Sequence, residues 1–147
     1  MEIKELRIGN YIQLKSEKDG VNDVFGVVTG ITNRKDDDFP KSDGVVSFYS
    51  ETNEGTKFSE FLNPISITEE WLLKFGFKEE DGNLVLDEFS TKNEEYLVQF
   101  NFEFLYDGEF VRLMDSWEGI FITEVKYVHQ FQNLYFSLIG EDIEFKT

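Results

Sequence analysis

Short apolar runs separated by polar turns dominate the first half of the chain. The runs are rich in β-branched and aromatic residues, and glycines interrupt them where the chain is expected to bend. Runs of this length bounded by turn residues are typical of strands, and several in succession indicate a small, strongly curved barrel or sandwich. We expect strands within Leu6–Leu14, Val24–Ile31, Val45–Tyr49 and Thr56–Phe61.

A well-signalled helix opens the second half of the chain. Thr68 stands where an N-cap hydroxyl can accept a hydrogen bond from an unpaired backbone N–H. Ile67 and Leu72 have the spacing of a hydrophobic staple, and Gly76 supplies the left-handed residue with which many helices end. The sequence therefore predicts a short helix that packs through Trp71, Leu72 and Phe75.

Alternation with a period of two marks the next element. From Tyr96 to Tyr106 every even position is apolar or aromatic, and several odd positions are polar. One aromatic face and one polar face are typical of a half-buried strand. Asp107-Gly108 then predicts a turn into a strand at Phe110–Met114, and strands at Leu84–Leu86 and Ile120–Val125 complete an antiparallel meander.

Apolar residues at helical spacing define the last element, a helix over Val128–Ile139 that Gly140 ends. Together the elements predict an α+β fold. A small β-rich, barrel-like subdomain spans residues 1–64, and a second subdomain with helix, antiparallel β-meander and C-terminal helix spans residues 65–147. The two subdomains either fold separately or share one core.

Acidic residues outnumber basic ones by 30 to 14, which gives a formal net charge of −16. Such a chain repels phosphate, so we expect no direct binding to nucleic acid or to an anionic membrane. Because 16% of the residues are aromatic, the composition predicts an ordered globule rather than an acidic disordered chain. The chain has no cysteine, no apolar run of membrane-spanning length and no secretory leader pattern, so we expect a cytoplasmic protein.

No constellation of residues indicates catalysis. His129 is the single histidine, and without a second histidine or a cysteine it is interpreted as a packed or capping side chain rather than a zinc ligand. Asp36, Asp37 and Asp38 offer oxygen ligands but lack the spacing of a calcium loop, which favours a solvated loop. Neither a Gly-x-Ser-x-Gly elbow nor a phosphate-binding glycine loop occurs. We therefore expect neither an enzyme nor a protein with a cofactor or metal.

Two stretches and the opening of the chain resemble a known group of sequences. One stretch is residues 65–77, Ile-Ser-Ile-Thr-Glu-Glu-Trp-Leu-Leu-Lys-Phe-Gly-Phe, and the other is residues 127–141, Tyr-Val-His-Gln-Phe-Gln-Asn-Leu-Tyr-Phe-Ser-Leu-Ile-Gly-Glu. With the opening at Leu6–Ile12, they are similar to a family of small uncharacterised proteins carried by phages and prophages of Bacteroidota bacteria. The matched stretches cover roughly a quarter of the chain and keep their order. The resemblance implies a phage context and a bacterial host, and it supplies no mechanism and no site residue.

Clustered carboxylates form the candidate contact surface. The segment 78–95 holds seven acidic residues against two lysines, and a second cluster lies at 36–38. Carboxylates at phosphate-like spacing can occupy a basic groove that binds nucleic acid. The alternative is a solvated acidic face that serves only solubility. The predicted contact residues are Asp36, Asp37, Asp38, Glu79, Glu80, Asp81, Asp87 and Glu88.

Charge and resemblance together lead us to expect a non-catalytic binding protein. The expected partner is a basic, nucleic-acid-handling host protein, and the most concrete form is an anti-CRISPR-like inhibitor of a defence nuclease, RNA-guided or other. The alternative is an accessory or structural phage protein whose acidity only serves solubility. If charge does not drive binding, the next candidates are apolar contacts through Tyr11, Tyr49 or Trp117.

Overall fold

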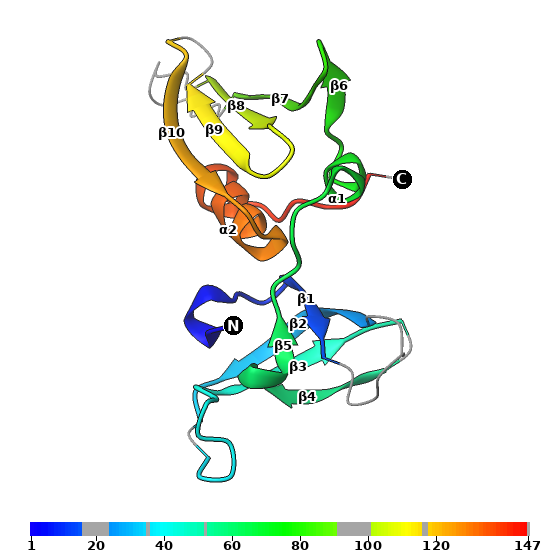
Figure 1. Ribbon diagram of the computed structural model, residues 1–147, viewed down its shortest axis with the longest axis vertical. Coiled ribbons are helices and arrows are strands. Elements are labelled where there is room, and N and C mark those ends of the chain that lie inside the picture. Colours follow the sequence, from blue (N-terminus) through cyan, green and yellow to red (C-terminus); the bar gives the residue numbers. More distant parts are fainter. Residues whose placement is uncertain (16–23, 35, 52, 91–100, 116–117, 147) are drawn as a thin grey trace. The chain divides into compact units, whose positions relative to one another are not determined.

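The computed structural model describes residues 1–15, 24–34, 36–51, 53–90, 101–115 and 118–146, with the backbone alone for 87–90 and 101–102 (Figure 1). The chain divides into two compact units. Unit 1 comprises residues 1–65 and 127–133, and unit 2 comprises residues 66–126 and 134–147. The predicted α+β class is confirmed, because each unit is built on an antiparallel sheet and the chain also forms α-helices.

A five-stranded antiparallel sheet curls into a half-barrel in unit 1. The strand order is β4-β3-β2-β1-β5, so the short fifth strand pairs with the first. A 3-10 helix, η2 (Ser59–Phe61), lies between β4 and β5, where the sequence had suggested the end of one longer strand. A second 3-10 helix, η1 (Ile3–Glu5), precedes the sheet. The strands are β1 (Tyr11–Leu14), β2 (Val24–Thr32), β3 (Val45–Tyr49), β4 (Glu54–Phe58) and β5 (Leu62–Asn63).

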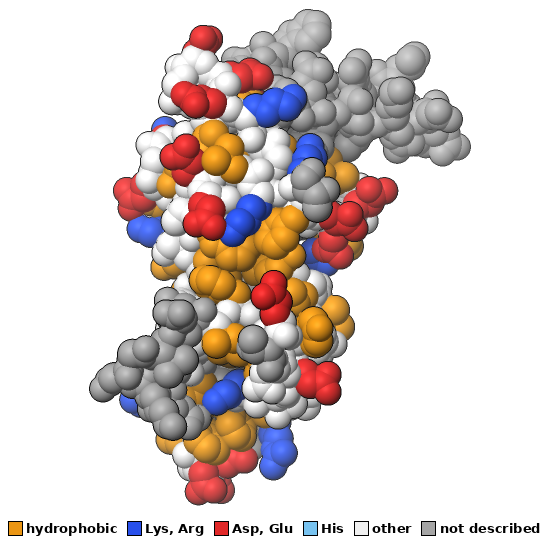
Figure 2. Space-filling model, turned by 90° about the vertical axis from the view of Figure 1, so that its right-hand side faces the viewer, with side chains coloured by type: hydrophobic (Ala, Val, Ile, Leu, Met, Phe, Trp, Pro, Cys, Tyr) orange, Lys and Arg blue, Asp and Glu red, His pale blue; other side chains and the backbone are white. Residues whose placement is uncertain are grey.

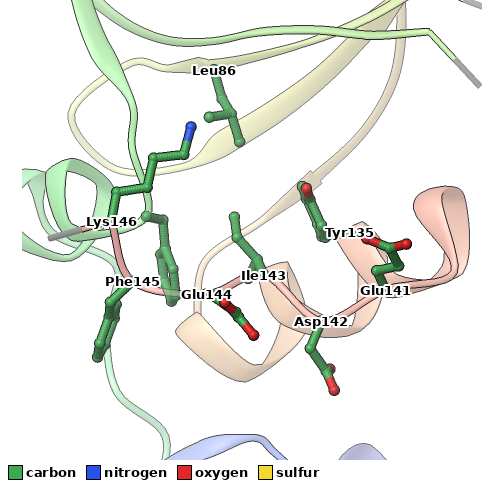
Figure 3. A pocket seen from close by; sticks show the side chains of 9 residues that line it. Leu86, Tyr135, Glu141, Asp142, Ile143, Glu144, Phe145 and Lys146 are labelled. Carbon is green, nitrogen blue, oxygen red and sulfur yellow. The ribbon is translucent and has the colours of Figure 1, made fainter.

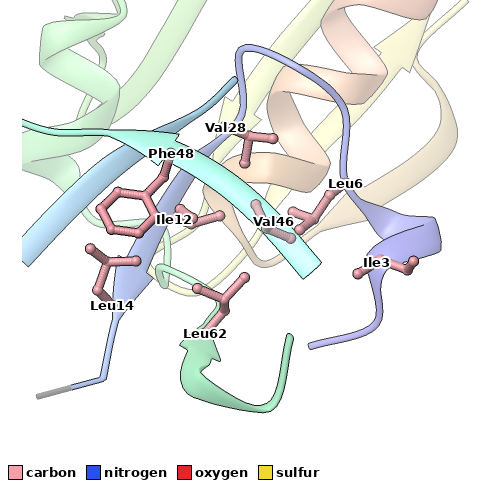
Figure 4. Packing of buried hydrophobic residues seen from close by; sticks show 8 residues of the cluster. All are labelled: Ile3, Leu6, Ile12, Leu14, Val28, Val46, Phe48 and Leu62. Carbon is pink, nitrogen blue, oxygen red and sulfur yellow. The ribbon is translucent and has the colours of Figure 1, made fainter. Parts of the chain in front are cut away.

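One face of this sheet carries the core of unit 1 (Figure 4). Side chains alternate along a strand, so Ile12 and Leu14 of β1 and Val46 and Phe48 of β3 are buried while their neighbours are not. This is the alternation that the sequence pattern predicts for strands with one buried face. The buried cluster consists of Ile3, Leu6, Ile12, Leu14, Val28, Val46, Phe48 and Leu62.

The first predicted strand is shorter than expected, because a turn replaces its first half. Gly9 has a φ of 93°, and the backbone N–H of Arg7 donates to Asn10 Oδ1 at 2.7 Å. The side chain of Asn10 is fully buried, and its Nδ2 donates to Asn133 Oδ1 at 2.9 Å. Local bonds from side chain to backbone compete with a strand ladder, so β1 begins only at Tyr11.

Residues 127–133 are part of unit 1, although they lie far along the chain from its sheet. They include the first half of α2 (Val128–Ile139), whose bounds match the predicted helix. Gln132 is 3% exposed; its Nε2 donates to Gly9 O at 3.1 Å, and its Oε1 accepts from the Tyr11 backbone N–H at 2.8 Å. A buried amide with both ends bonded avoids the cost of unsatisfied polar atoms and holds this part of α2 against β1.

The sheet of unit 2 is a five-stranded antiparallel meander with the order β10-β9-β8-β7-β6. The predicted hairpin at Asp107-Gly108 is confirmed, because Tyr106 pairs with Val111 across it. The predicted strand at 96–106 is seen from residue 101 onward, and its earlier part lies outside the described residues. The strands are β6 (Lys78–Glu80), β7 (Asn83–Ser90), β8 (Asn101–Tyr106), β9 (Val111–Asp115) and β10 (Ile120–Val125).

The edge strand β6 was not predicted. Its three residues are polar and exposed, so no apolar alternation marks it in the sequence. Its pairing with β7 follows from the turn Asp81-Gly82, in which both residues have a positive φ, 49° and 83°. A two-residue turn of this kind matches the twist of a hairpin, and Asp-Gly is a preferred sequence for it. The Asp81-Gly82 pair is therefore the sequence signal from which the β6–β7 hairpin could have been predicted.

The helix α1 (Glu69–Lys74) ends as predicted but begins differently. Thr68 occupies the N-cap position with extended backbone, yet its side chain makes no capping hydrogen bond, so that part of the prediction is wrong. At the other end Gly76 has a φ of 91°, and the Phe77 N–H donates to Leu72 O at 3.0 Å. This is the Schellman arrangement that a glycine after a helix favours.

Replacing Gly76 by alanine should lower the free energy of unfolding by about 1–2 kcal/mol, the cost of a left-handed backbone for a residue with a Cβ. That Cβ would also overlap Lys146 Cδ, so the lysine side chain has to move. Gly140→Ala is the matched control, because Gly140 has a φ of 82° with nothing within 4 Å of the added Cβ. Urea denaturation should give the larger loss for Gly76→Ala; equal losses would mean that the Lys146 contact contributes nothing.

Candidate interaction surface

The negative charge of the chain is concentrated in unit 2. Unit 1 holds 12 acidic and 8 basic residues, a net charge of −4, whereas unit 2 holds 18 acidic and 6 basic residues, a net charge of −12. Three quarters of the net charge of −16 therefore belongs to unit 2. A field of one sign over a small body attracts basic surfaces over distances of about a Debye length, about 8 Å at physiological ionic strength.

Glu79, Glu80 and Asp81 form the β6 cluster, which is more accessible than the predicted contact group Asp36–Asp38. All three are exposed, and none takes part in an ion pair with a described residue. Antiparallel pairing with β7 and the Asp81-Gly82 turn fix their backbone. On the face shown in Figure 2, acidic side chains are interspersed with lysine, arginine and apolar side chains. The β6 cluster is thus a local group of carboxylates on a well-defined hairpin.

The second predicted group, Asp36, Asp37 and Asp38, lies in a loop of unit 1 and is partly engaged in its own structure. Asp36 Oδ1 accepts a hydrogen bond from the backbone N–H of Asp38 at 3.1 Å. Asp36 Oδ2 also lies 3.6 Å from Arg34 Nη2. An aspartate that bonds the backbone two residues on is a turn former. In this group Asp37 and Asp38 are the exposed carboxylates.

Asp87 and Glu88 complete the predicted contact residues and lie on β7, where the backbone alone is described. The register between β7 and β8 shifts between Leu86 and Phe89, so both acidic residues fall at an irregularity of the ladder. Extra residues of this kind bend a strand locally. The structure thus brings Glu79 and Glu80 into one hairpin with the strand of Asp87 and Glu88, and it places Asp36–Asp38 in the other unit.

A hollow of about 640 Å³ opens on unit 2 beside its C-terminal segment (Figure 3). Burial raises the pKa of the Tyr135 hydroxyl, and the negative charge of Glu141 raises it further. Figure 3 shows Ile143 and Tyr135 on the side of the segment that faces Leu86, whereas the carboxylates of Asp142 and Glu144 point to the other side. The acidic groups therefore do not converge into this hollow as a set of ligands. Its lining residues are Phe75, Leu86, Tyr135 and the segment Glu141–Lys146.

Glu141, Asp142 and Glu144 after Gly140 suggest a solvated acidic tail, but the structure shows a packed C-terminal segment. Ile143 is buried, and the Lys146 backbone N–H donates to Lys74 O at 2.8 Å. The ring of Phe145 lies 5.7 Å from Trp71 and 5.2 Å from Phe75. Aromatic pairs at these distances are stabilising, so the apolar residues between the acidic ones hold the segment to unit 2.

A Ser-Asp group in unit 1, with Ser59 buried and Asp43 half-buried, is the nearest approach to a catalytic pattern among the described residues. Ser59 Oγ donates to Asp43 Oδ1 at 2.6 Å, and the Ile3 backbone N–H donates to Asp43 Oδ2 at 3.0 Å. Burial raises the pKa of the Asp43 carboxyl, but these hydrogen bonds outweigh it and hold the pKa below its ordinary value. Ser59 is 1% exposed and bonded also to Ser42, so the group ties loops together and offers no accessible nucleophile.

His129 is buried in unit 1, 1% exposed, in the second helical position of α2. Neither ring nitrogen has a hydrogen-bond partner among the described residues, and the ring stacks on Tyr127 with centroids 5.9 Å apart. Burial lowers the pKa of the imidazole to about 4, with a further lowering from the positive charge of the N-terminus. The side chain is thus neutral at pH 7 and inaccessible to a ligand.

Two of the aromatic residues that the sequence suggested for contacts share one sheet face. Tyr11 of β1 and Tyr49 of β3 both pair with Val27 of β2, which lies between them. Directly opposed residues of antiparallel strands project from the same face, and Tyr49 is 57% exposed. Trp117, the third of these residues, lies outside the described part of the chain.

Neither a metal site nor a membrane helix is found in the described part of the chain, and comparisons with known proteins add no further candidate. Among the described residues, no three histidine, cysteine or carboxylate side chains are grouped as a metal site. None of the helices in the described segments combines the length and apolar character needed to cross a membrane. No protein-family model, curated protein or solved structure matches the chain.

Proposed function

We propose that this chain is a non-catalytic binding protein whose unit 2 contacts a basic, nucleic-acid-handling host protein. The observation that carries the proposal is the charge of unit 2, 18 acidic against 6 basic residues within 75 residues of chain. The β6 cluster supplies exposed carboxylates on a hairpin of defined backbone. Such a surface is complementary to a groove that binds phosphate, and charge complementarity acts mainly on specificity and on the association rate.

The resemblance to phage and prophage proteins favours a host protein as the partner. Occupation of a nucleic-acid groove by carboxylates would block its normal ligand without chemistry. An inhibitor of a bacterial defence nuclease, of the anti-CRISPR kind, is the most concrete form of this proposal. The protein would act stoichiometrically, so one inhibitor molecule would disable one partner molecule.

Capture from host lysate tests the proposal with matched charge-neutral variants. We expect Glu79→Gln/Glu80→Gln/Asp81→Asn to slow association with the captured partner by about tenfold, because steering by charge can change association rates by tenfold or more. The amide side chains keep the shape, and asparagine tolerates the left-handed backbone of Asp81. Asp36→Asn/Asp37→Asn/Asp38→Asn is the comparison, because the proposal places the contact on unit 2 and so leaves these three predicted contact residues of unit 1 outside it. This variant should leave the rate within about twofold, and an equal slowing would mean that the charge acts as a diffuse field.

Salt provides the second arm of this experiment. Raising the ionic strength should slow association of the wild-type protein and reduce the difference between it and the β6 variant, because exposed charges are screened. A nuclease or its guide complex among the captured proteins supports the proposal. An association rate that changes neither with salt nor in the β6 variant rejects the proposal. Capture of a virion component points instead to an accessory or structural role.

A further inference from the structure

The strand β10 (Ile120–Val125) lies at the opposite edge of the unit 2 sheet from β6 (Lys78–Glu80), and it differs from that polar edge in carrying exposed apolar side chains. It is an edge of the sheet, paired with β9 on one side among the described residues. None of its six residues is buried. An edge strand presents unpaired backbone N–H and C=O groups, to which another extended chain can add.

Three consecutive apolar side chains are exposed on this edge. Ile120 and Phe121 are each 52% exposed, and Ile122 is 46% exposed. The neighbouring strand β9 shows the ordinary alternation, in which Val111 and Leu113 are buried. A scattered apolar residue at a surface needs no explanation, but a contiguous apolar group on a sheet edge is typical of a binding surface.

A bulge limits what can dock on this edge. Phe121 lies opposite Met114 and Thr123 lies opposite Leu113, so Ile122 is an extra residue in β10. A bulge bends the strand and interrupts its ladder, which works against long, flat pairing between sheets. The edge is therefore suited to a short extended segment.

The charges around β10 select the occupant. Antiparallel pairing of two copies centred on Phe121 would bring Glu118 of each copy towards Glu124 of the other, and each unit 2 carries a net charge of −12. Like charges across paired strands are destabilising, so a second copy is disfavoured. Glu118 has no ion pair with a described residue, and Glu124 Oε2 has a long contact, 3.4 Å, to Arg112 Nε. Lysine or arginine of another chain can meet both carboxylates.

We propose that β10 is the docking strand for a short extended segment of a basic partner protein. Apolar residues of that segment pack against Ile120, Phe121 and Ile122, and a lysine or arginine at each end meets Glu118 and Glu124. This inference rests on the proposed function, because it takes the partner to be basic. It adds that recognition depends on a short-range apolar contact at β10 as well as on the long-range field of unit 2.

Short synthetic peptides test the docking strand on the full chain without knowledge of the partner. One capped peptide carries a central Val-Ile-Val with a Thr-Lys pair at each end, and its control carries glutamate in place of lysine. In a nuclear magnetic resonance titration, the lysine peptide should shift the backbone amide signals of residues 120–125. The glutamate peptide should bind at least about tenfold more weakly, the change that about 1.4 kcal/mol produces.

Variants separate apolar contact from general attraction. Phe121→Ser/Ile122→Ser should weaken the lysine peptide by about tenfold or more, because those side chains provide the buried apolar area. Leu73→Gln is the control, since Leu73 is 48% exposed on α1 of the same unit. It should leave peptide affinity within about twofold. Circular dichroism melts check that each variant is folded, because substitutions at exposed positions usually change stability little.

Three results would overturn the docking strand. The first is equal binding of both peptides, the second is lysine-peptide binding that the Phe121→Ser/Ile122→Ser variant leaves unchanged, and the third is a dimer in sedimentation analysis that this variant dissociates. If one of these occurs while partner capture still depends on the β6 cluster and on salt, the docking strand is wrong and the proposed function stands. If partner capture depends neither on the β6 cluster nor on salt, the proposed function is wrong, regardless of the peptide results.

Discussion

Replacing Phe75 by alanine should lower the free energy of unfolding by about 3–5 kcal/mol, the usual cost of truncating a buried aromatic side chain. Phe75 is 1% exposed at the end of α1, and its ring lies 5.2 Å from that of Phe145 and 6.0 Å from that of Trp71. Removal of the ring leaves a cavity on which α1 and the C-terminal segment can only partly close. Urea denaturation followed by circular dichroism measures the loss.

Trp71→Ala is the informative comparison, because the sequence pattern assigns Trp71 to the same apolar stripe. In the structure Trp71 is half-buried, and it packs on Phe75 and Phe145 with Lys74 Nζ 5.5 Å from its ring centroid. We therefore expect a smaller loss, about 1–2 kcal/mol, within the range of ordinary substitutions. If Trp71→Ala costs as much as Phe75→Ala, the ranking by burial is wrong. If both cost less than about 0.5 kcal/mol, the aromatic cluster does not hold unit 2 together.

Elements with a local signal were predictable from the sequence. The bounds of α2 follow from apolar residues at helical spacing and from Gly140, which has a φ of 82°. The strand β3 matches its predicted range, Val45–Tyr49, because its buried residues alternate with half-buried or exposed ones. In these cases the local preference of the chain agrees with the tertiary structure.

The features that sequence reasoning missed depend on contacts between distant residues. Gln132 and Asn133 look like polar residues of an amphipathic helix, but they bond Gly9, Asn10 and Tyr11 more than 120 residues away. No local pattern encodes such a pairing. The packed C-terminal segment was missed for a similar reason, because its acidic residues suggested solvation while Ile143 and Phe145 carry the contact.

The individual acidic residues of the candidate interaction surface were predicted, but the concentration of negative charge in unit 2 was not pointed out. The acidic clusters can be read directly from the sequence, and Glu79, Glu80 and Asp81 are exposed in the structure as a solvated or contacting face requires. The division of charge between the units is already contained in the sequence, because the predicted boundary between residues 64 and 65 gives the same net charges of −4 and −12. Residues 127–133, which the structure assigns to unit 1, carry no charged side chain and leave this division unchanged. The sequence pattern places Ile120–Ile122 in a strand, but it does not show that this strand lies at the edge of the sheet with these side chains exposed. The order of strands depends on the pairing of the whole sheet.

His129→Leu should remove part of the acid sensitivity of folding. Above pH 6.5 the imidazole is neutral in both the folded and the unfolded protein. Its contribution to the free energy of unfolding therefore does not change with pH in that range. Below pH 6.5 the unfolded chain takes up a proton that the folded protein resists down to the lowered pKa of about 4. Because one pKa unit corresponds to 1.36 kcal/mol, the free energy of unfolding should fall by about 3 kcal/mol as the pH drops through this window.

The difference between wild type and His129→Leu isolates this loss from the many carboxylates that titrate in the same range. We expect the two proteins to diverge below about pH 6, the variant being the more stable by about 3 kcal/mol near pH 4, because leucine has no proton to bind. Urea denaturation at a series of pH values gives both curves, and the imidazole proton signals in nuclear magnetic resonance report the titration directly. Parallel stability curves, or a His129 that titrates near pH 6.5 in the folded protein, would mean that solvent or a carboxylate reaches the ring. The burial that separates His129 from water in unit 1 is thus tested by its titration, independently of any partner.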